Sequence, residues 1–195
     1  MVRGIIFDCF GVLYHGSLGH LRDITPPERR DELMDLSHSS DLGYVTKEDY
    51  LKAVASYTNT SEQEIETILK TDHVRNLAMV DLVRSLRSEY KVALLSNVGQ
   101  HIIDHLFTPA DVDELFDTVV LSSDVHMMKP DPAIFELTAQ RLGLLPEECV
   151  MIDDIEVNID GAKRAGMQGI ICVSTEQTTN DLHVLLGEKQ YARTT

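Results

Sequence analysis

Residues 2–13 read Val-Arg-Gly-Ile-Ile-Phe-Asp-Cys-Phe-Gly-Val-Leu, and this stretch decides the fold of the chain. The run Val2–Phe7 is apolar without a regular alternation of polar residues, which is typical of a parallel strand buried on both faces of a sheet. The run stops at Asp8, and Gly11 follows three residues later. We therefore expect a buried strand that leads directly into a polar turn.

Four further runs of the same apolar, β-branched kind follow along the chain. They are Lys91–Leu95, Thr118–Leu121, Cys149–Ile152 and Gly169–Val173. Segments with helical signals separate them: Asp131-Pro132 is typical of a helix start, and Gly143 and Gly166 are typical of helix ends. Repeated strand–helix units predict an α/β fold, namely a doubly wound, Rossmann-like parallel sheet of five strands.

The segment after the first strand has a different character. It contains no strand-like run but offers three helix starts of the capping-box type, at Thr25, Thr46 and Ser61. We predict an all-helical insert over residues 14–77, with residues 1–13 and 78–195 forming the main domain. The acidic residues Glu62, Glu64 and Glu66 of this insert are interpreted as a solvated helix face.

Composition and charge limit the classes of function. The chain has 195 residues, with 17 Lys and Arg against 32 Asp and Glu, so its formal net charge is −15. Such an acidic surface repels phosphate backbones and anionic lipids, which argues against nucleic acid or a membrane as a partner. No apolar run approaches the roughly 18–20 residues of a membrane span, and the start does not resemble a signal peptide. We expect a cytoplasmic protein with reduced, buried cysteines, and the oligomeric state is left open.

Polar residues occur where the predicted strands end. Asp8 follows the first run, Ser96-Asn97 the second and Asp153-Asp154 the fourth, while Lys129 follows the third. Ligands of doubly wound sheets bind beyond the carboxyl ends of the strands, so these side chains are expected at one edge. Crowded carboxylates need a hard cation such as Mg²⁺, and a nearby lysine and hydroxyl suit a phosphoryl group. Asp8 is then the natural nucleophile.

In this order and spacing the residues resemble the haloacid dehalogenase superfamily, whose Mg²⁺-dependent phosphatases share four motifs. Besides the turn at Asp8, the matching stretches are Leu94–Asn97, Met128–Phe135 and Ile152–Asp154, the last followed by Asn158, Ala162, Ala165, Gly166 and Met167. The resemblance covers nearly the whole chain. It implies a five-stranded sheet of order 5-4-1-2-3 and a small helical cap inserted after the first strand.

The resemblance also implies roles for single residues. Asp8 would be the nucleophile and a metal ligand, and Ser96 and Lys129 would contact the phosphoryl group, with Asn97 beside them. Mg²⁺ would be held by Asp8, the backbone carbonyl of Phe10 and Asp154, with Asp153 binding directly or through water. Asn158 would have a supporting role.

The chain departs from the family pattern at Phe10. Most family phosphatases carry a second aspartate there, which protonates the leaving group, and a phenyl ring does not donate a proton. The leading hypothesis is a Mg²⁺-dependent phosphatase of a small phosphorylated metabolite, with a sugar phosphate as one candidate. A metal-independent 2-haloacid dehalogenase using the same aspartate is the alternative, which Phe10 favours and the Asp153-Asp154 pair disfavours. A non-catalytic or weakly active binding protein is the third hypothesis.

Overall fold

A computed structural model of the chain describes residues 1–16, 19–71, 73–99 and 102–187. Its centre is a five-stranded parallel sheet. The strands are β1 (Gly4–Phe7), β4 (Lys91–Ser96), β5 (Thr118–Leu121), β6 (Cys149–Asp153) and β7 (Gln168–Ile171). Their order is β5-β4-β1-β6-β7. Numbered in chain order and read from the other edge, this is the predicted order 5-4-1-2-3, and each strand lies within two residues of its predicted bounds.

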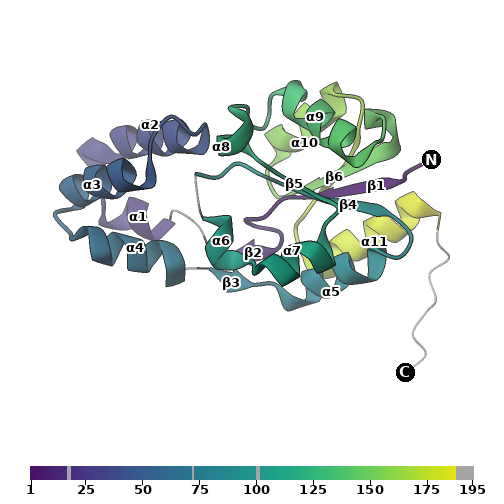
Figure 1. Cartoon of the computed structure of the whole chain (residues 1–195), viewed down its shortest axis with the longest axis horizontal. Helices are drawn as coiled ribbons and strands as arrows, with labels where there is room; N and C mark the ends of the chain where they lie inside the picture. Colours follow the sequence, from purple (N-terminus) through teal and green to yellow (C-terminus); the bar gives the residue numbers. More distant parts are fainter. Residues whose placement is uncertain (17–18, 72, 100–101, 188–195) are drawn as a thin grey trace.

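Helices cover both faces of the sheet, as Figure 1 shows. One face carries α9 (Pro132–Leu142) and α10 (Glu156–Arg164), and the other carries α5 (Leu77–Leu86), α7 (Pro109–Leu115) and α11 (Thr175–Leu186). Shorter elements connect them: α6 (Ile103–Leu106), α8 (Ser122–Val125) and the 3₁₀ helix η2 (Pro146–Glu148). Asp131 caps α9 and Gly143 ends it in a left-handed conformation, as predicted.

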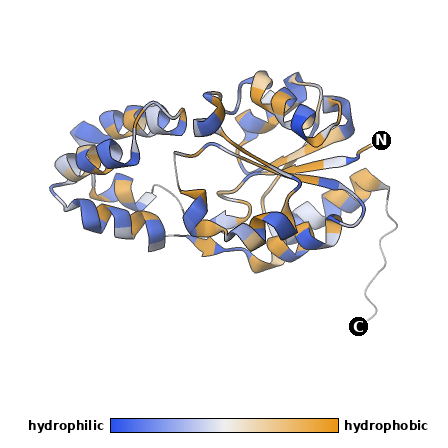
Figure 2. Cartoon of the chain, viewed as in Figure 1, coloured by the Kyte–Doolittle hydropathy of each residue, from blue (hydrophilic) through white to orange (hydrophobic). Residues whose placement is uncertain are grey.

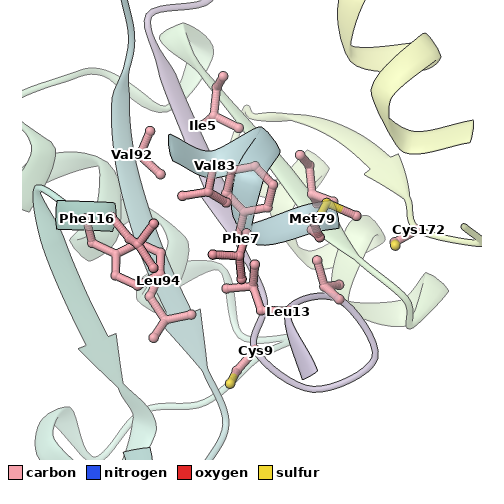
Figure 3. Close-up of a cluster of buried hydrophobic side chains, with 14 of the residues drawn as sticks. Ile5, Phe7, Cys9, Leu13, Met79, Val83, Val92, Leu94, Phe116 and Cys172 are labelled. Atoms are coloured by element: carbon pink, nitrogen blue, oxygen red, sulfur yellow. The ribbon is translucent and has the colours of Figure 1, made fainter. Parts of the chain in front are cut away.

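The covered faces explain why the strands are apolar throughout. Side chains of alternating strand positions point to opposite faces, and each face has its own hydrophobic cluster. In the cluster drawn in Figure 3, Phe7 and Leu94 from the sheet lie close to Val83 of α5 and to Phe116. Figure 2 shows the central strands as largely hydrophobic, whereas the surrounding helices alternate between hydrophilic and hydrophobic segments.

The insert after β1 is helical and has a separate hydrophobic cluster. It contains α1 (Gly19–Ile24), the 3₁₀ helix η1 (Pro27–Arg29), α2 (Arg30–Asp41), α3 (Lys47–Thr58) and α4 (Glu62–Thr71). Buried side chains from all four α-helices pack together without the sheet: Leu21, Leu33, Tyr50, Leu51, Val54 and Ile65. We refer to residues 14–77 as the cap and to the rest as the core domain. This division remains a prediction from the sequence.

Two of the three predicted capping boxes begin helices as expected. Thr46 accepts a hydrogen bond from Asp49 N, and Ser61 and Glu64 cap each other reciprocally. The prediction at Thr25 is wrong, because its hydroxyl donates to the Leu21 carbonyl, 2.6 Å away, within the preceding turn. The following segment begins as η1 without a side-chain cap, since prolines occupy the next two positions.

Two short strands that the sequence analysis did not predict lie at the ends of the cap. The strands β2 (Tyr14–His15) and β3 (Val74–Arg75) pair in antiparallel orientation, so the two connections between cap and core run side by side. Asn76 adds to this pairing by donating from its side chain to the Val12 carbonyl, 3.1 Å away. At two residues each, these strands are too short to produce a detectable alternation in sequence.

All three cysteines are buried free thiols, as expected. Within the described residues, no helix combines the length and the apolar composition needed to span a membrane.

Candidate active site

The carboxyl ends of three neighbouring strands bring most of the predicted site residues together. Because β1 pairs with β4 on one side and β6 on the other, Asp8, Ser96 and Asp153 lie at the same edge of the sheet. Lys129 reaches this edge from the loop between α8 and α9. The side chains of these four residues are all buried.

Lys129 is placed between two carboxylates. Its Nζ lies 2.7 Å from Oδ1 of Asp8 and 2.6 Å from Oδ2 of Asp153. Burial acts to lower the pKa of Lys129, but the charges of the two carboxylates outweigh burial and hold this pKa above its ordinary value. The lysine is therefore a fixed positive charge between the two acids.

The carboxylate of Asp153 is fully engaged within the protein. The side-chain amide of Asn158 donates to both of its oxygens, at 3.0 and 3.1 Å, and the backbone N–H of Ile155 donates to Oδ1 at 2.9 Å. With Lys129 on Oδ2, these bonds fix the orientation of Asp153. Asn158 thus supports the site through Asp153.

Asp8 has one oxygen held and one oxygen available. Oδ1 accepts from the backbone N–H of Cys9 at 2.7 Å and pairs with Lys129, whereas no donor from the described residues bonds to Oδ2. Burial raises the pKa of Asp8 to about 7, with a further contribution from the charge of Asp153, although Lys129 and the Cys9 N–H act to lower it. This side chain is ionised most readily when additional positive charge is nearby.

Asp154 completes a cluster of three carboxylates. Ligand atoms of Asp8, Asp153 and Asp154 all lie within 4.8 Å of one another, and Asp154 is the exposed member. The backbone turn after β1 makes room for it: Gly11 has a φ of +79°, and a Cβ atom there would lie 2.1 Å from Oδ2 of Asp154. Oxygen donors at this spacing, one of them open to solvent, fit a hard divalent cation such as Mg²⁺.

Ser96 ends β4 next to this cluster and Asn97 follows it, and their side chains differ in hydrogen bonding. The hydroxyl of Ser96 is buried and has no hydrogen-bond partner in the described part of the chain. A buried hydroxyl without a partner is costly unless a ligand supplies one. In contrast, the Asn97 side chain bonds the backbone carbonyl and N–H of Lys129, each at 2.9 Å, and so holds the lysine loop.

Phe10 lies where the site meets the cap. Its ring packs on the His73 ring, with centroids 4.9 Å apart, and both residues line a cavity of about 420 Å³ between cap and core.

The sequence analysis did not identify the cap residues that line this cavity. Glu62 and Glu64 are exposed, as predicted, whereas Glu66 is only one-third exposed, lines the cavity and pairs with Lys47 at 2.6 Å and Lys70 at 3.0 Å. The Lys70 pairing has the helical i,i+4 spacing that a search for charge pairs would detect.

Comparison with known proteins adds to this geometry. The family model described as haloacid dehalogenase-like hydrolase matches residues 2–166. Among curated proteins, fructose-1-phosphate phosphatase YqaB of Escherichia coli is 33% identical over 99 residues, which are 51% of this chain and 53% of that protein. The matched region is thus about half the length of this relative.

A longer match at lower identity is (S)-2-haloacid dehalogenase 2 of Pseudomonas sp. strain CBS-3. It is 26% identical over 187 residues, covering 86% of this chain and 82% of that protein. Among solved structures, the HAD family enzyme BT-2542 of Bacteroides thetaiotaomicron, in complex with magnesium and inorganic phosphate, has a TM-score of 0.76. At 22% identity, covering 88% of this chain and 94% of that one, this likeness shows the shared fold.

Proposed function

The chain belongs to the haloacid dehalogenase-like hydrolase family, and on this premise we propose that it is a Mg²⁺-dependent phosphatase acting on a small phosphorylated metabolite. The observation that carries the proposal is the arrangement around Asp8. One oxygen of Asp8 is fixed by Lys129 and the Cys9 N–H, while the other has no donor among the described residues. Asp154 lies in the same carboxylate cluster, and the buried Ser96 hydroxyl at the end of the neighbouring strand has no partner there. A nucleophile, a cation and a buried donor without a partner suit the transfer of a phosphoryl group.

In the proposed first step, Oδ2 of Asp8 attacks phosphorus. The new Asp8–phosphorus bond forms as the bond between phosphorus and the leaving-group oxygen breaks, which gives an aspartyl phosphate and an alkoxide that takes a proton from water. Lys129 and Ser96 donate hydrogen bonds to the phosphoryl oxygens, and Asn97 keeps Lys129 in place. Water then attacks phosphorus, and inorganic phosphate leaves while Asp8 is restored.

The metal is proposed from the same residues. Asp8, Asp154 and the backbone carbonyl of Phe10 would hold Mg²⁺, and Asp153 would act directly or through water. When bound, Mg²⁺ neutralises negative charge on the phosphoryl group and on the carboxylates around it. The engagement of both Asp153 oxygens by Lys129, Asn158 and Ile155 favours the indirect role for Asp153.

A 2-haloacid dehalogenase is the second candidate. The long match to the Pseudomonas dehalogenase and the absence of an acid at Phe10 favour it, because displacement of halide needs no proton donor for the leaving group. The exposed Asp154 beside Asp8 and Asp153 disfavours it, since an anionic haloacid would meet three carboxylates around one lysine.

A substrate screen with and without Mg²⁺ separates the candidates. We expect release of phosphate from one or more small phosphate esters in the presence of Mg²⁺, loss of this activity in excess EDTA, and no halide release from 2-chloropropionate. Halide release that persists in EDTA would overturn the phosphatase in favour of the dehalogenase. No turnover of any ester or haloacid would instead indicate a binding protein.

A further inference from the structure

The cavity between cap and core adjoins the site where phosphoryl transfer is proposed. Phe10, two residues after Asp8, and Asn97, directly after Ser96, both line it. A phosphate ester with its phosphoryl group at Asp8 would extend its leaving group into this cavity. The volume of about 420 Å³ is sufficient for a group the size of a substituted aromatic ring or a hexose.

The wall of this cavity is predominantly apolar. From the core, the apolar contributions are Phe10, Val98 and Ile102, and from the cap they include Leu33, Met34 and Leu69. Phe10 lies two residues after Asp8 in sequence, and its ring is already packed on His73. Apolar groups placed against this wall lose water-exposed surface, which is favourable in proportion to the area buried.

Most polar side chains of the wall are engaged with other protein groups. The hydroxyls of Ser37 and Tyr50 lie 3.2 Å apart and bond each other, and the Asp41 carboxylate accepts from the Gly99 backbone N–H. Glu66 is shared by two lysines, and Asn97 is occupied by the Lys129 backbone.

Among the described residues of the wall, the polar side chains left to meet a polyol are mostly at exposed or half-buried positions. Arg22 and His105 are exposed and already reach water, Lys47 and Lys70 are partly exposed and share Glu66, and Ser40 is buried and small. A sugar carries several hydroxyls, and each hydroxyl that loses water without gaining a partner weakens binding.

We propose that the leaving group of the natural substrate is an apolar, ring-bearing alcohol rather than a polyhydroxylated one. This inference rests on the proposed phosphatase function and narrows its substrate class. It is carried by the composition of the cavity wall and does not depend on how readily the leaving group departs.

The direct test compares two primary-alkyl phosphates, 2-phenylethyl phosphate and glycerol 3-phosphate. Their leaving groups are both primary alcohols, so the chemical step is similar and the cavity decides the difference. We expect kcat/KM at saturating Mg²⁺ to be at least tenfold higher for the phenylethyl ester, as burial of a phenyl group predicts. Equal values, or a preference for glycerol 3-phosphate, would overturn the inference and leave the phosphatase function standing.

A substitution at Met34 tests the wall itself. This side chain is 56% exposed, so Met34→Gln changes polarity at nearly constant shape without disturbing a buried cluster. We expect kcat/KM for the phenylethyl ester to fall several-fold in Met34→Gln and to be retained in Met34→Leu. Val184→Gln, at an exposed residue of α11, is the control. A fall of equal size for both esters in Met34→Gln would contradict the inference.

The affinity for the two esters tests this inference independently of the proposed phosphatase function. Calorimetry with the Asp8→Asn protein and Mg²⁺ measures the affinity for the two esters without turnover. Tighter binding of 2-phenylethyl phosphate is expected. If the wild-type protein hydrolysed neither ester, the proposed function would fail for these compounds, and the binding data alone would decide the inference. Equal or weaker binding of the phenylethyl ester would then overturn it.

Discussion

At the scale of single residues, Lys129 holds one positive charge between the buried carboxylates of Asp8 and Asp153. Lys129→Met leaves these two acids facing each other without a cation. Removing one partner of a buried ion pair typically costs about 3–5 kcal/mol, and we expect the free energy of unfolding to fall by about 3 kcal/mol in urea at pH 8. Lys163→Met, at an exposed lysine of α10, is the matched control. If Lys129→Met lost no more free energy of unfolding than Lys163→Met, the role of Lys129 as the cation that balances Asp8 and Asp153 would be contradicted.

The two neighbouring aspartates are expected to respond differently to truncation. Asp154 is exposed and faces the Gly11 turn, whereas Asp153 is buried and bonded by three residues. Asp154→Ala should lower Mg²⁺ affinity more than tenfold at nearly unchanged stability. Asp153→Ala should mainly destabilise the fold, by about 2–3 kcal/mol, because Lys129 and Asn158 lose their partner. Calorimetric titration with Mg²⁺ and urea unfolding of both variants measure the two effects, and the reverse ranking would reject this division of roles.

The meeting of most site residues at one edge of the sheet could be predicted from the sequence. The positions of Asp8, Ser96, Asp153 and Asp154 follow from one rule, that the carboxyl ends of parallel strands meet at one edge. Lys129 lies in a loop after β5, so this rule alone does not place its side chain, and its role follows from the family resemblance. The engagement of Asn97 with the Lys129 backbone could not be predicted, because it depends on the path of a loop 32 residues away. The same holds for Glu66 at the cavity wall, whose exposure is decided by how the cap rests on the core.

At the scale of elements, the turn after β1 combines a left-handed backbone with a close approach to Asp154. Gly11→Ala would place a Cβ at a φ of +79° and 2.1 Å from Oδ2 of Asp154. We expect a loss of about 1–2 kcal/mol in stability and a loss of Mg²⁺ affinity as Asp154 is displaced. Gly143→Ala is the control, since its φ of +72° brings similar strain but its Cβ would meet nothing within 4 Å. Equal Mg²⁺ affinity in the two variants, measured by calorimetry, would show that Gly11 has no role in the metal site.

The elements themselves differ in how well their sequence specifies them. The five core strands are predictable because burial on both faces demands continuous apolar runs, and Thr118–Leu121 even has its predicted bounds. The β2–β3 pair is not predictable, since Tyr14–His15 and Val74–Arg75 are held by the closeness of two chain connections rather than by a local pattern. Thr25 shows the opposite error, in which a good local pattern is overridden by the prolines that follow it.

At the scale of the whole molecule, the cap meets the core where α2 ends, close to the bond between the His126 ring and the Leu42 carbonyl, and Asp41 contributes a largely buried carboxyl group to this contact. Its carboxylate accepts from Gly99 N–H, its carbonyl accepts from the Ser122 hydroxyl at 2.5 Å, and burial raises its pKa from 3.8 to about 7. The folded state binds the proton of the Asp41 carboxyl group more tightly than the unfolded state does. Below about pH 4 this group is protonated in both states, so it does not lower the free energy of unfolding. Its cost to stability grows as the pH rises to about 7 and is complete above it.

Asp41→Asn removes this cost and retains an oxygen that accepts from Gly99. We expect the variant to match the wild-type protein in stability at pH 4 and to exceed it by on the order of 2 kcal/mol at pH 8. Asp35→Asn, at an exposed position of the same helix, is the control. Urea unfolding at the two pH values measures the difference. A gain of the same size at both pH values would exclude titration of Asp41 as its cause.

The central claim for the whole molecule is that Asp8 carries the phosphoryl group during turnover, and acid quenching tests it most directly. The wild-type protein is quenched while it hydrolyses its best phosphate ester at saturating Mg²⁺, and its peptides are analysed by mass spectrometry beside those of Asp8→Asn. We predict one added phosphoryl group on the peptide that contains Asp8, none in Asp8→Asn, and no release of phosphate by that variant. A phosphoryl group on another residue, or phosphate release by folded Asp8→Asn at more than a few per cent of the wild-type rate, would contradict the account.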